Sequence, residues 1–85
     1  MRYTVTVERG PQRVLDSLRG DLYRRIIEAL RRLADNPRPP GVKKLKGRFT
    51  YWRIRIGDYR IIYTVQDDRL LVSVVLIGHR REVYE

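Results

Sequence analysis

The sequence has 85 residues, enough for one domain and too few for two, so we expect residues 1–85 to form a single domain. It contains no cysteine and one histidine, which excludes disulfides and thiolate metal sites, and we expect no metal and no cofactor. No apolar run approaches the roughly 18 residues of a membrane helix, and the N-terminus MRYTVTVERG is too polar for a signal peptide. We therefore predict a cytoplasmic protein without a membrane partner, and its net charge of +9 favours a polyanionic partner.

The first part of the chain predicts one strand and two helices. Apolar and polar residues alternate over residues 2–8, as in a half-buried strand. The pair Gly10-Pro11 then opens a short helix that Gly20 can end. Asp21 can cap a second helix, which carries apolar residues at helical spacing to about Asp35.

The rest of the chain predicts a loop and three strands. Prolines block helix continuation at the start of residues 37–48, PRPPGVKKLKGR, which we predict to be a connecting loop within the domain. Strands are predicted at about 49–56, 59–66 and 70–77, separated by the two-residue turn signals Gly57-Asp58 and Asp67-Asp68. The order β-α-α-β-β-β predicts an α+β fold, in which a helical hairpin packs on one face of a small, mainly antiparallel sheet.

The positive charge is concentrated in residues 38–60. This segment holds eight basic residues and a single carboxylate, so that it carries +7 of the net +9. Such a segment is either a solvated basic loop or a surface that contacts nucleic-acid phosphates. The candidates for RNA contact are Lys43, Lys44, Lys46 and Arg48, together with Arg81 near the C-terminus.

The turn at Gly57-Asp58 predicts the register of the first hairpin. With two loop residues, Arg55 lies opposite Arg60, and Arg53 projects from the same side because side chains alternate along a strand. The other side of the hairpin carries Trp52, Ile54, Ile56, Tyr59, Ile61 and Tyr63, and it is the predicted core face.

The second turn predicts where the C-terminal residues lie. If Gln66 faces Arg69, the side chains of Leu70, Val72, Val74 and Leu76 join the core face. The last strand then returns toward the Gly57-Asp58 turn. We therefore expect the segment that follows it to add His79, Arg80, Arg81 and Tyr84 to the arginines.

Two arginines opposite each other call for an explanation. Like charges directly across a strand pair destabilise the sheet by about 0.2–1 kcal/mol. Both side chains either extend into water and lose little, or they bind a phosphate between them through bidentate hydrogen bonds. The second alternative predicts a binding site for the RNA backbone at this end of the sheet.

These features resemble the RelE branch of the RelE/ParE superfamily of bacterial and archaeal toxins. The specific stretches are GDYRIIY at 57–63 and GHRREVY at 78–84, and the resemblance extends over nearly the whole chain. It implies a RelE-like microbial RNase fold and a ribosome-dependent endonuclease that cleaves mRNA in the ribosomal A site and inhibits translation. It also implies neutralisation by a cognate RelB-like antitoxin in a toxin–antitoxin hetero-oligomer.

The resemblance also implies catalytic residues. The family's basic pair, its third-strand arginine, its post-strand arginine and its C-terminal tyrosine fall on Arg53, Arg55, Arg60, Arg80 and Tyr84. In such enzymes the 2′-hydroxyl attacks the adjacent phosphodiester without a metal. A familiar form of the motif has lysines where Arg53 and Arg55 stand, and because arginine is a poor general base, proton transfer is expected from Tyr84 or His79.

Other interpretations remain open at this stage. His79 could simply cap the end of the strand, and Tyr84 could serve only in packing. The same fold also serves ParE-like toxins, which inhibit DNA gyrase without cutting nucleic acid, and fold alone does not decide function. A third alternative is a toxin that has lost catalysis and only binds its antitoxin.

Overall fold

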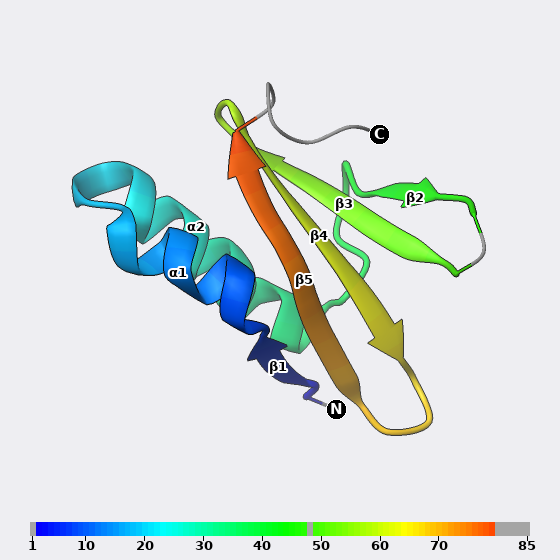
Figure 1. Ribbon diagram of the computed structural model, residues 1–85. Coiled ribbons are helices and arrows are strands. Elements are labelled where there is room, and N and C mark those ends of the chain that lie inside the picture. Colours follow the sequence, from blue (N-terminus) through cyan, green and yellow to red (C-terminus); the bar gives the residue numbers. More distant parts are fainter. Residues whose placement is uncertain (1, 48, 80–85) are drawn as a thin grey trace.

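A computed structural model describes residues 2–47 and 49–79. It contains two helices and five strands in the order β1-α1-α2-β2-β3-β4-β5 (Figure 1). The bounds are Thr4–Val7 for β1, Arg9–Ser17 for α1, Gly20–Asp35 for α2, Lys43–Leu45 for β2, Tyr51–Ile56 for β3, Tyr59–Gln66 for β4 and Leu71–His79 for β5. The α+β prediction is confirmed, but the segment 37–48 is not all loop, because it contains β2.

The strands form one mixed sheet in the order β1-β5-β4-β3-β2. β1 pairs with β5 in parallel, and every other pairing is antiparallel. Both helices lie on the same face of this sheet (Figure 1). Neither helix in the described ranges is long and apolar enough to cross a membrane.

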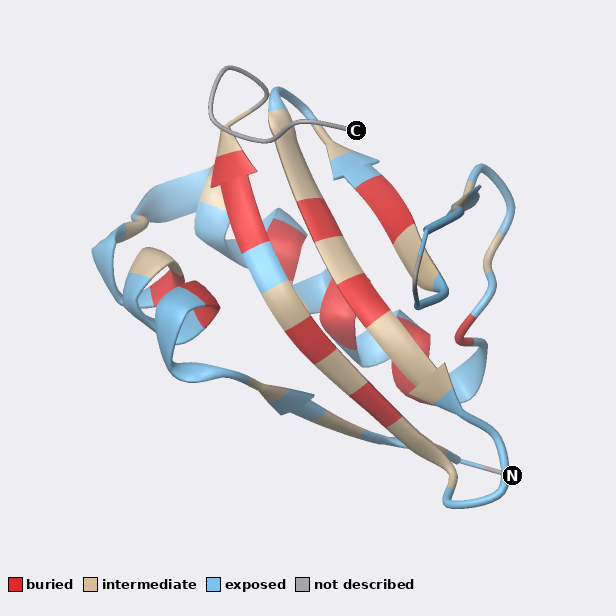
Figure 2. Ribbon diagram, turned by 45° about the vertical axis from the view of Figure 1, so that its right-hand side comes forward, coloured by how far each residue is buried: buried red, intermediate tan, exposed pale blue. Residues whose placement is uncertain are grey.

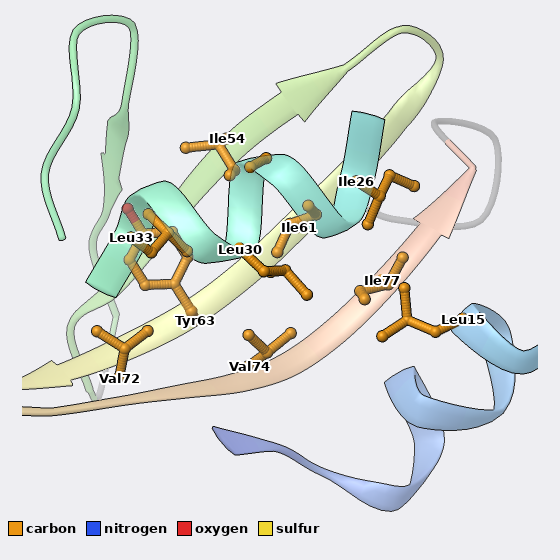
Figure 3. Close-up of a cluster of buried hydrophobic side chains, with 11 residues drawn as sticks. Leu15, Ile26, Leu30, Leu33, Ile54, Ile61, Tyr63, Val72, Val74 and Ile77 are labelled. Atoms are coloured by element: carbon orange, nitrogen blue, oxygen red, sulfur yellow. The ribbon is translucent and has the colours of Figure 1, made fainter. Parts of the chain in front are cut away.

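The core lies between α2 and the middle strands of the sheet. From α2, Ile26 and Leu33 are fully buried, and they meet Ile61 and Tyr63 of β4 (Figure 3). Buried and less buried residues alternate along β4, as expected for a strand that is covered by helices on one face (Figure 2). The hydroxyl of Tyr63 donates a hydrogen bond of 2.7 Å to the Pro37 carbonyl, which fixes the chain just after α2.

The junction between the helices differs from the prediction. α1 ends at Ser17, and Gly20 begins α2 with a φ of +66° instead of ending α1. Arg19 is the N-cap residue, so Asp21 lies in the first turn of α2. There its carboxylate is placed favourably near the positive end of the helix dipole.

The β4–β5 connection also differs from the prediction. Gln66 pairs with Leu71, so the turn has four residues instead of two, and Leu70 in it has a φ of +51°. This shift of two residues leaves the core face of β5 unchanged over the first half of the strand. An irregularity between Ile62 and Tyr63 then adds a residue to β5, which turns Leu76 outward and brings Ile77 into the core.

A polar cluster ties three separate segments together at the β4–β5 turn. Asp67 accepts hydrogen bonds of 3.1 and 2.8 Å from Arg38 and one of 2.6 Å from the Tyr3 hydroxyl. The bonds from Arg38, and then that from Tyr3, lower the pKa of Asp67 to about 2. The Arg38 guanidinium also lies 4.9 Å from the centre of the Trp52 ring, so the basic segment is attached to β3 as well.

Candidate nucleic-acid interface

The first hairpin gathers arginines on one face of the sheet. Arg55 and Arg60 are partners across β3 and β4, and Ile56 pairs with Tyr59, so the predicted two-residue turn and register are confirmed. Arg53 projects from the same face as Arg55, because the two residues are separated by one position on a strand. This face is the one opposite the helices, since Ile54 between them is buried in the core. We call Arg53, Arg55 and Arg60 the arginine cluster.

The three members of the arginine cluster differ in burial, and their charges act on one another. Arg53 is only 6% exposed, whereas Arg55 is exposed and Arg60 is partly buried. Burial, followed by the charges of Arg55 and Arg60, lowers the pKa of Arg53. Each of these causes acts against the charged form, whereas the negative charge of a bound phosphate would favour it.

The short strand β2 brings one predicted lysine to the arginine cluster. Lys43 pairs with Arg53, so its side chain lies on the same face. Lys44 pairs with Trp52 and lies on the other face, with its ammonium 5.7 Å from the centre of the Trp52 ring. Lys46 is exposed just beyond the strand, and the predicted RNA contact at Arg48 lies outside the described residues.

His79 does not lie where the sequence predicts. It is the last residue of β5 and pairs with Tyr59, whereas Arg60 pairs with Gly78. The His79 and Tyr59 rings are in edge contact, with centroids 5.6 Å apart, and Tyr59 packs against the core. His79 is therefore on the face covered by the helices. The prediction failed because the longer turn and the extra residue in β5 move this strand by three positions at its end.

The remaining predicted site residues, Arg80, Arg81 and Tyr84, lie outside the described residues. Their roles stay predictions. Within residues 2–47 and 49–79 there is no group of three or more His, Asp or Glu side chains that could hold a metal ion. The positive groups on the described part of this face are the guanidinium groups of the arginine cluster and the ammonium group of Lys43.

Sequence reasoning missed a second set of basic residues, on α2. Arg25 and Arg32 are exposed and line pockets between α2 and β3. The signal was available, because residues seven apart lie on nearly the same side of a helix.

Comparison with known proteins places the chain in a toxin family. A family model described as the ParE toxin of type II toxin–antitoxin systems (parDE) matches residues 2–84. Among curated proteins, toxin RelE3 of Methanocaldococcus jannaschii is 43% identical over 44 residues, which is 52% of this chain and 48% of that relative. The chain thus aligns with about half the length of this relative.

Solved structures agree in fold. A chain in the archaeal RelE–RelB complex from Pyrococcus horikoshii OT3 is 31% identical, with a TM-score of 0.84 over 98% of this chain and 100% of that one. A chain in the RelBE2 toxin–antitoxin complex from Mycobacterium tuberculosis is 26% identical, with a TM-score of 0.78 over 94% of this chain and 100% of that one. The predicted RelE-like fold is therefore confirmed. The chain belongs to the ParE toxin family of type II toxin–antitoxin systems, within the RelE/ParE toxin superfamily.

Proposed function

We propose that this protein is a ribosome-dependent mRNA endonuclease that cleaves mRNA in the ribosomal A site and is neutralised by a cognate RelB-like antitoxin. The observation that carries the proposal is the pairing of Arg55 with Arg60, beside the buried Arg53, on the sheet face opposite the helices. Guanidinium groups gathered on one face suit bidentate hydrogen bonds to the phosphates of an RNA backbone. Action on ribosomes would place the protein in the cytoplasm.

The reaction proposed for this site is an internal transesterification. The 2′-oxygen of the RNA attacks the adjacent phosphorus, and the bond to the 5′-oxygen breaks. The products are a 2′,3′-cyclic phosphate and a free 5′-hydroxyl. One proton leaves the attacking 2′-hydroxyl, and one is delivered to the departing 5′-oxygen.

The arginines would stabilise the charge that develops on phosphorus oxygens in the transition state. Arg53 and Arg55 suit bidentate phosphate binding, and Arg60 and Arg80 suit charge stabilisation. Arginine remains protonated and cannot serve as the base. Because His79 lies on the opposite face of the sheet, the proposal assigns proton transfer to Tyr84, whose phenol would be acidified by neighbouring cations.

A cognate antitoxin is the proposed partner. The similar structures from Pyrococcus horikoshii and Mycobacterium tuberculosis are both complexes of a toxin with its antitoxin. The net charge of +9 favours an acidic partner. We expect the two proteins to form a hetero-oligomer.

Primer extension on messages from a translating cell extract tests the nuclease proposal. We expect new 5′ ends within codons when the wild-type protein is added. Arg60→Ala should reduce cleavage by about 100-fold or more, because it removes a charge-stabilising donor. Arg13→Ala, an exposed arginine on α1, is the control and should cut normally. Intact messages in an extract whose translation has stopped would contradict the proposal.

The ParE family match supports a second candidate, inhibition of DNA gyrase without nuclease activity. A supercoiling assay with purified gyrase separates the two functions. Tyr84→Phe should abolish mRNA cleavage by a nuclease and leave a gyrase inhibitor nearly unaffected. A protein that shows neither activity but still binds its antitoxin would be a toxin that has lost catalysis.

A further inference from the structure

Arg38 is the first basic residue of the segment 38–60, and its charge is paired with a carboxylate. Its Nη1 and Nη2 donate hydrogen bonds of 3.1 and 2.8 Å to the two carboxylate oxygens of Asp67, in the β4–β5 turn. Asp67 also accepts the hydrogen bond from the Tyr3 hydroxyl, just before β1. Isolated ion pairs between exposed side chains contribute little, but a bidentate pair within a network is an exception. Arg38 is therefore better suited to hold the chain in place than to contact RNA.

The ring of Trp52 on β3 contacts both ends of the loop that leads to β2. The Arg38 guanidinium lies 4.9 Å from the ring centre, and the Lys44 ammonium lies 5.7 Å from it. Both distances are within the range of cation–π attraction, which extends to about 6 Å. The chain thus leaves Trp52 at Arg38 and returns to it at Lys44, so one side chain holds both ends of the loop.

The residues between these two contacts form a tight turn. Pro39 and Pro40 have fixed φ angles, and the Val42 amide donates a hydrogen bond of 3.1 Å to the Pro39 carbonyl. Gly41 has a φ of +88°, which residues with a Cβ atom rarely adopt. Because few torsions of this turn are free to absorb a displacement, the position of Arg38 is transmitted to Lys43.

The strand β2 needs such an anchor because its own pairing is short. It consists of the three residues Lys43–Leu45 at the edge of the sheet, and it pairs with β3 alone (Figure 1). Segments with few backbone hydrogen bonds open locally at a low cost in free energy. Lys43 begins β2 and pairs with Arg53 on the face of the arginine cluster. Its position there thus depends on the loop that precedes it.

We infer that the Arg38–Asp67 pair positions Lys43 for RNA binding, because it holds β2 in register with β3. Arg38 and Asp67 are positioning residues, and Lys43 is the residue that contacts a phosphate. The inference rests on the proposed function in one respect, because it takes single-stranded RNA as the ligand of this face of the sheet.

Electrostatics alone predict the opposite effect of removing the Asp67 carboxylate. Asp67→Asn makes the protein more positive by one charge, and a more positive protein should bind a polyanion more tightly. If Asp67 positions Lys43, the same substitution weakens RNA binding instead. Asp68→Asn makes the same charge change at the next exposed position of the turn, so it is the matched control.

Titration of a labelled single-stranded RNA of about a dozen nucleotides measures the sign of this effect, at a temperature at which circular dichroism shows every variant folded. We expect Asp67→Asn to raise the Kd about tenfold, the loss expected for one charge-assisted hydrogen bond, and to reduce the salt slope of binding by about 0.7. Asp68→Asn should bind as the wild type does or more tightly. Unchanged or tighter binding by Asp67→Asn would overturn the inference.

A double-mutant cycle with Lys43→Gln separates positioning from a general loss of stability. Lys43→Gln should weaken RNA binding by the wild type and by Asp68→Asn to the same extent. In Asp67→Asn it should have little further effect, because Lys43 is already displaced there. Additive effects of Asp67→Asn and Lys43→Gln would contradict positioning through Lys43.

Amide hydrogen exchange tests the position of β2 without RNA. In Asp67→Asn we expect the amides of β2 to exchange about tenfold faster than in Asp68→Asn, measured relative to the amides of α2, which report global unfolding. Unchanged relative exchange in β2 would overturn the inference whether or not the protein binds RNA. Faster exchange in β2, in a protein that binds no RNA, would refute the proposed function and would support the role of Arg38 and Asp67 in holding β2.

Discussion

Replacing Tyr63 with phenylalanine tests how the basic segment is attached to the sheet. The Tyr63 side chain is fully buried, and its hydroxyl donates a 2.7 Å hydrogen bond to the Pro37 carbonyl. The substitution keeps the ring and leaves a buried carbonyl without this donor. We expect a loss of about 1–2 kcal/mol in the free energy of unfolding. For a chain of this size, that corresponds to a Tm lower by about 5–15 °C.

The same residue predicts a change of stability with alkaline pH. Burial raises the pKa of Tyr63 from 10.0 to about 12. The pKa of Tyr63 is higher in the folded state than in the unfolded state. The contribution of the neutral Tyr63 phenol to the free energy of unfolding is therefore fully present below pH 10 and is lost as the pH rises toward 12. At about pH 11 the wild type should have lost about 1.4 kcal/mol, which is the equivalent of one pKa unit. The phenylalanine variant cannot lose it, so the stabilities of the two proteins should converge there.

Urea unfolding followed by circular dichroism between pH 7 and 11.5 measures both effects. Tyr59→Phe is the matched control, because Tyr59 lies on the same strand and is only partly buried. It should differ little from the wild type at pH 7. Equal stability of the wild type and Tyr63→Phe at pH 7, or parallel curves up to pH 11.5, would refute the reasoning.

Three further predictions follow from the structure. Asp67→Asn should lower the Tm at pH 7 more than the neighbouring Asp68→Asn does. This difference in Tm should vanish as the pH falls through about 2, because the Asp67 carboxylate is then protonated. A difference in Tm that persists in acid would contradict this prediction. Ile26→Ala should reduce the free energy of unfolding by about 2–5 kcal/mol, because Ile26 is fully buried. By contrast, Leu76→Ala should cost less than about 1 kcal/mol in the same urea titration, since Leu76 is 38% exposed. Arg60→Gln should weaken the binding of single-stranded RNA. It should also reduce, by about 0.7, the slope of the logarithm of the binding constant against the logarithm of the salt concentration. An unchanged slope would argue against a contact between Arg60 and a phosphate.

The sequence alone determined the arrangement of the arginine cluster. Gly57 and Asp58 form a two-residue turn, and this local geometry fixes which residues of β3 and β4 face each other. Alternation along the strands then places Arg53, Arg55 and Arg60 on one face. The core face of the hairpin followed for the same reason, because Ile54 and Ile61 alternate with the arginines.

Only the tertiary structure decided the position of the neighbouring elements. The parallel pairing of β1 with β5 joins residues far apart in the sequence, and no local signal specifies it. β2 is a strand of three residues that is stabilised mainly by pairing with β3, and the extra residue in β5 reflects packing of Ile77 against the helices. These long-range contacts placed His79 on the sheet face opposite the arginine cluster. Short-range turn geometry can be read from neighbouring residues, whereas contacts between distant segments depend on how the whole core packs.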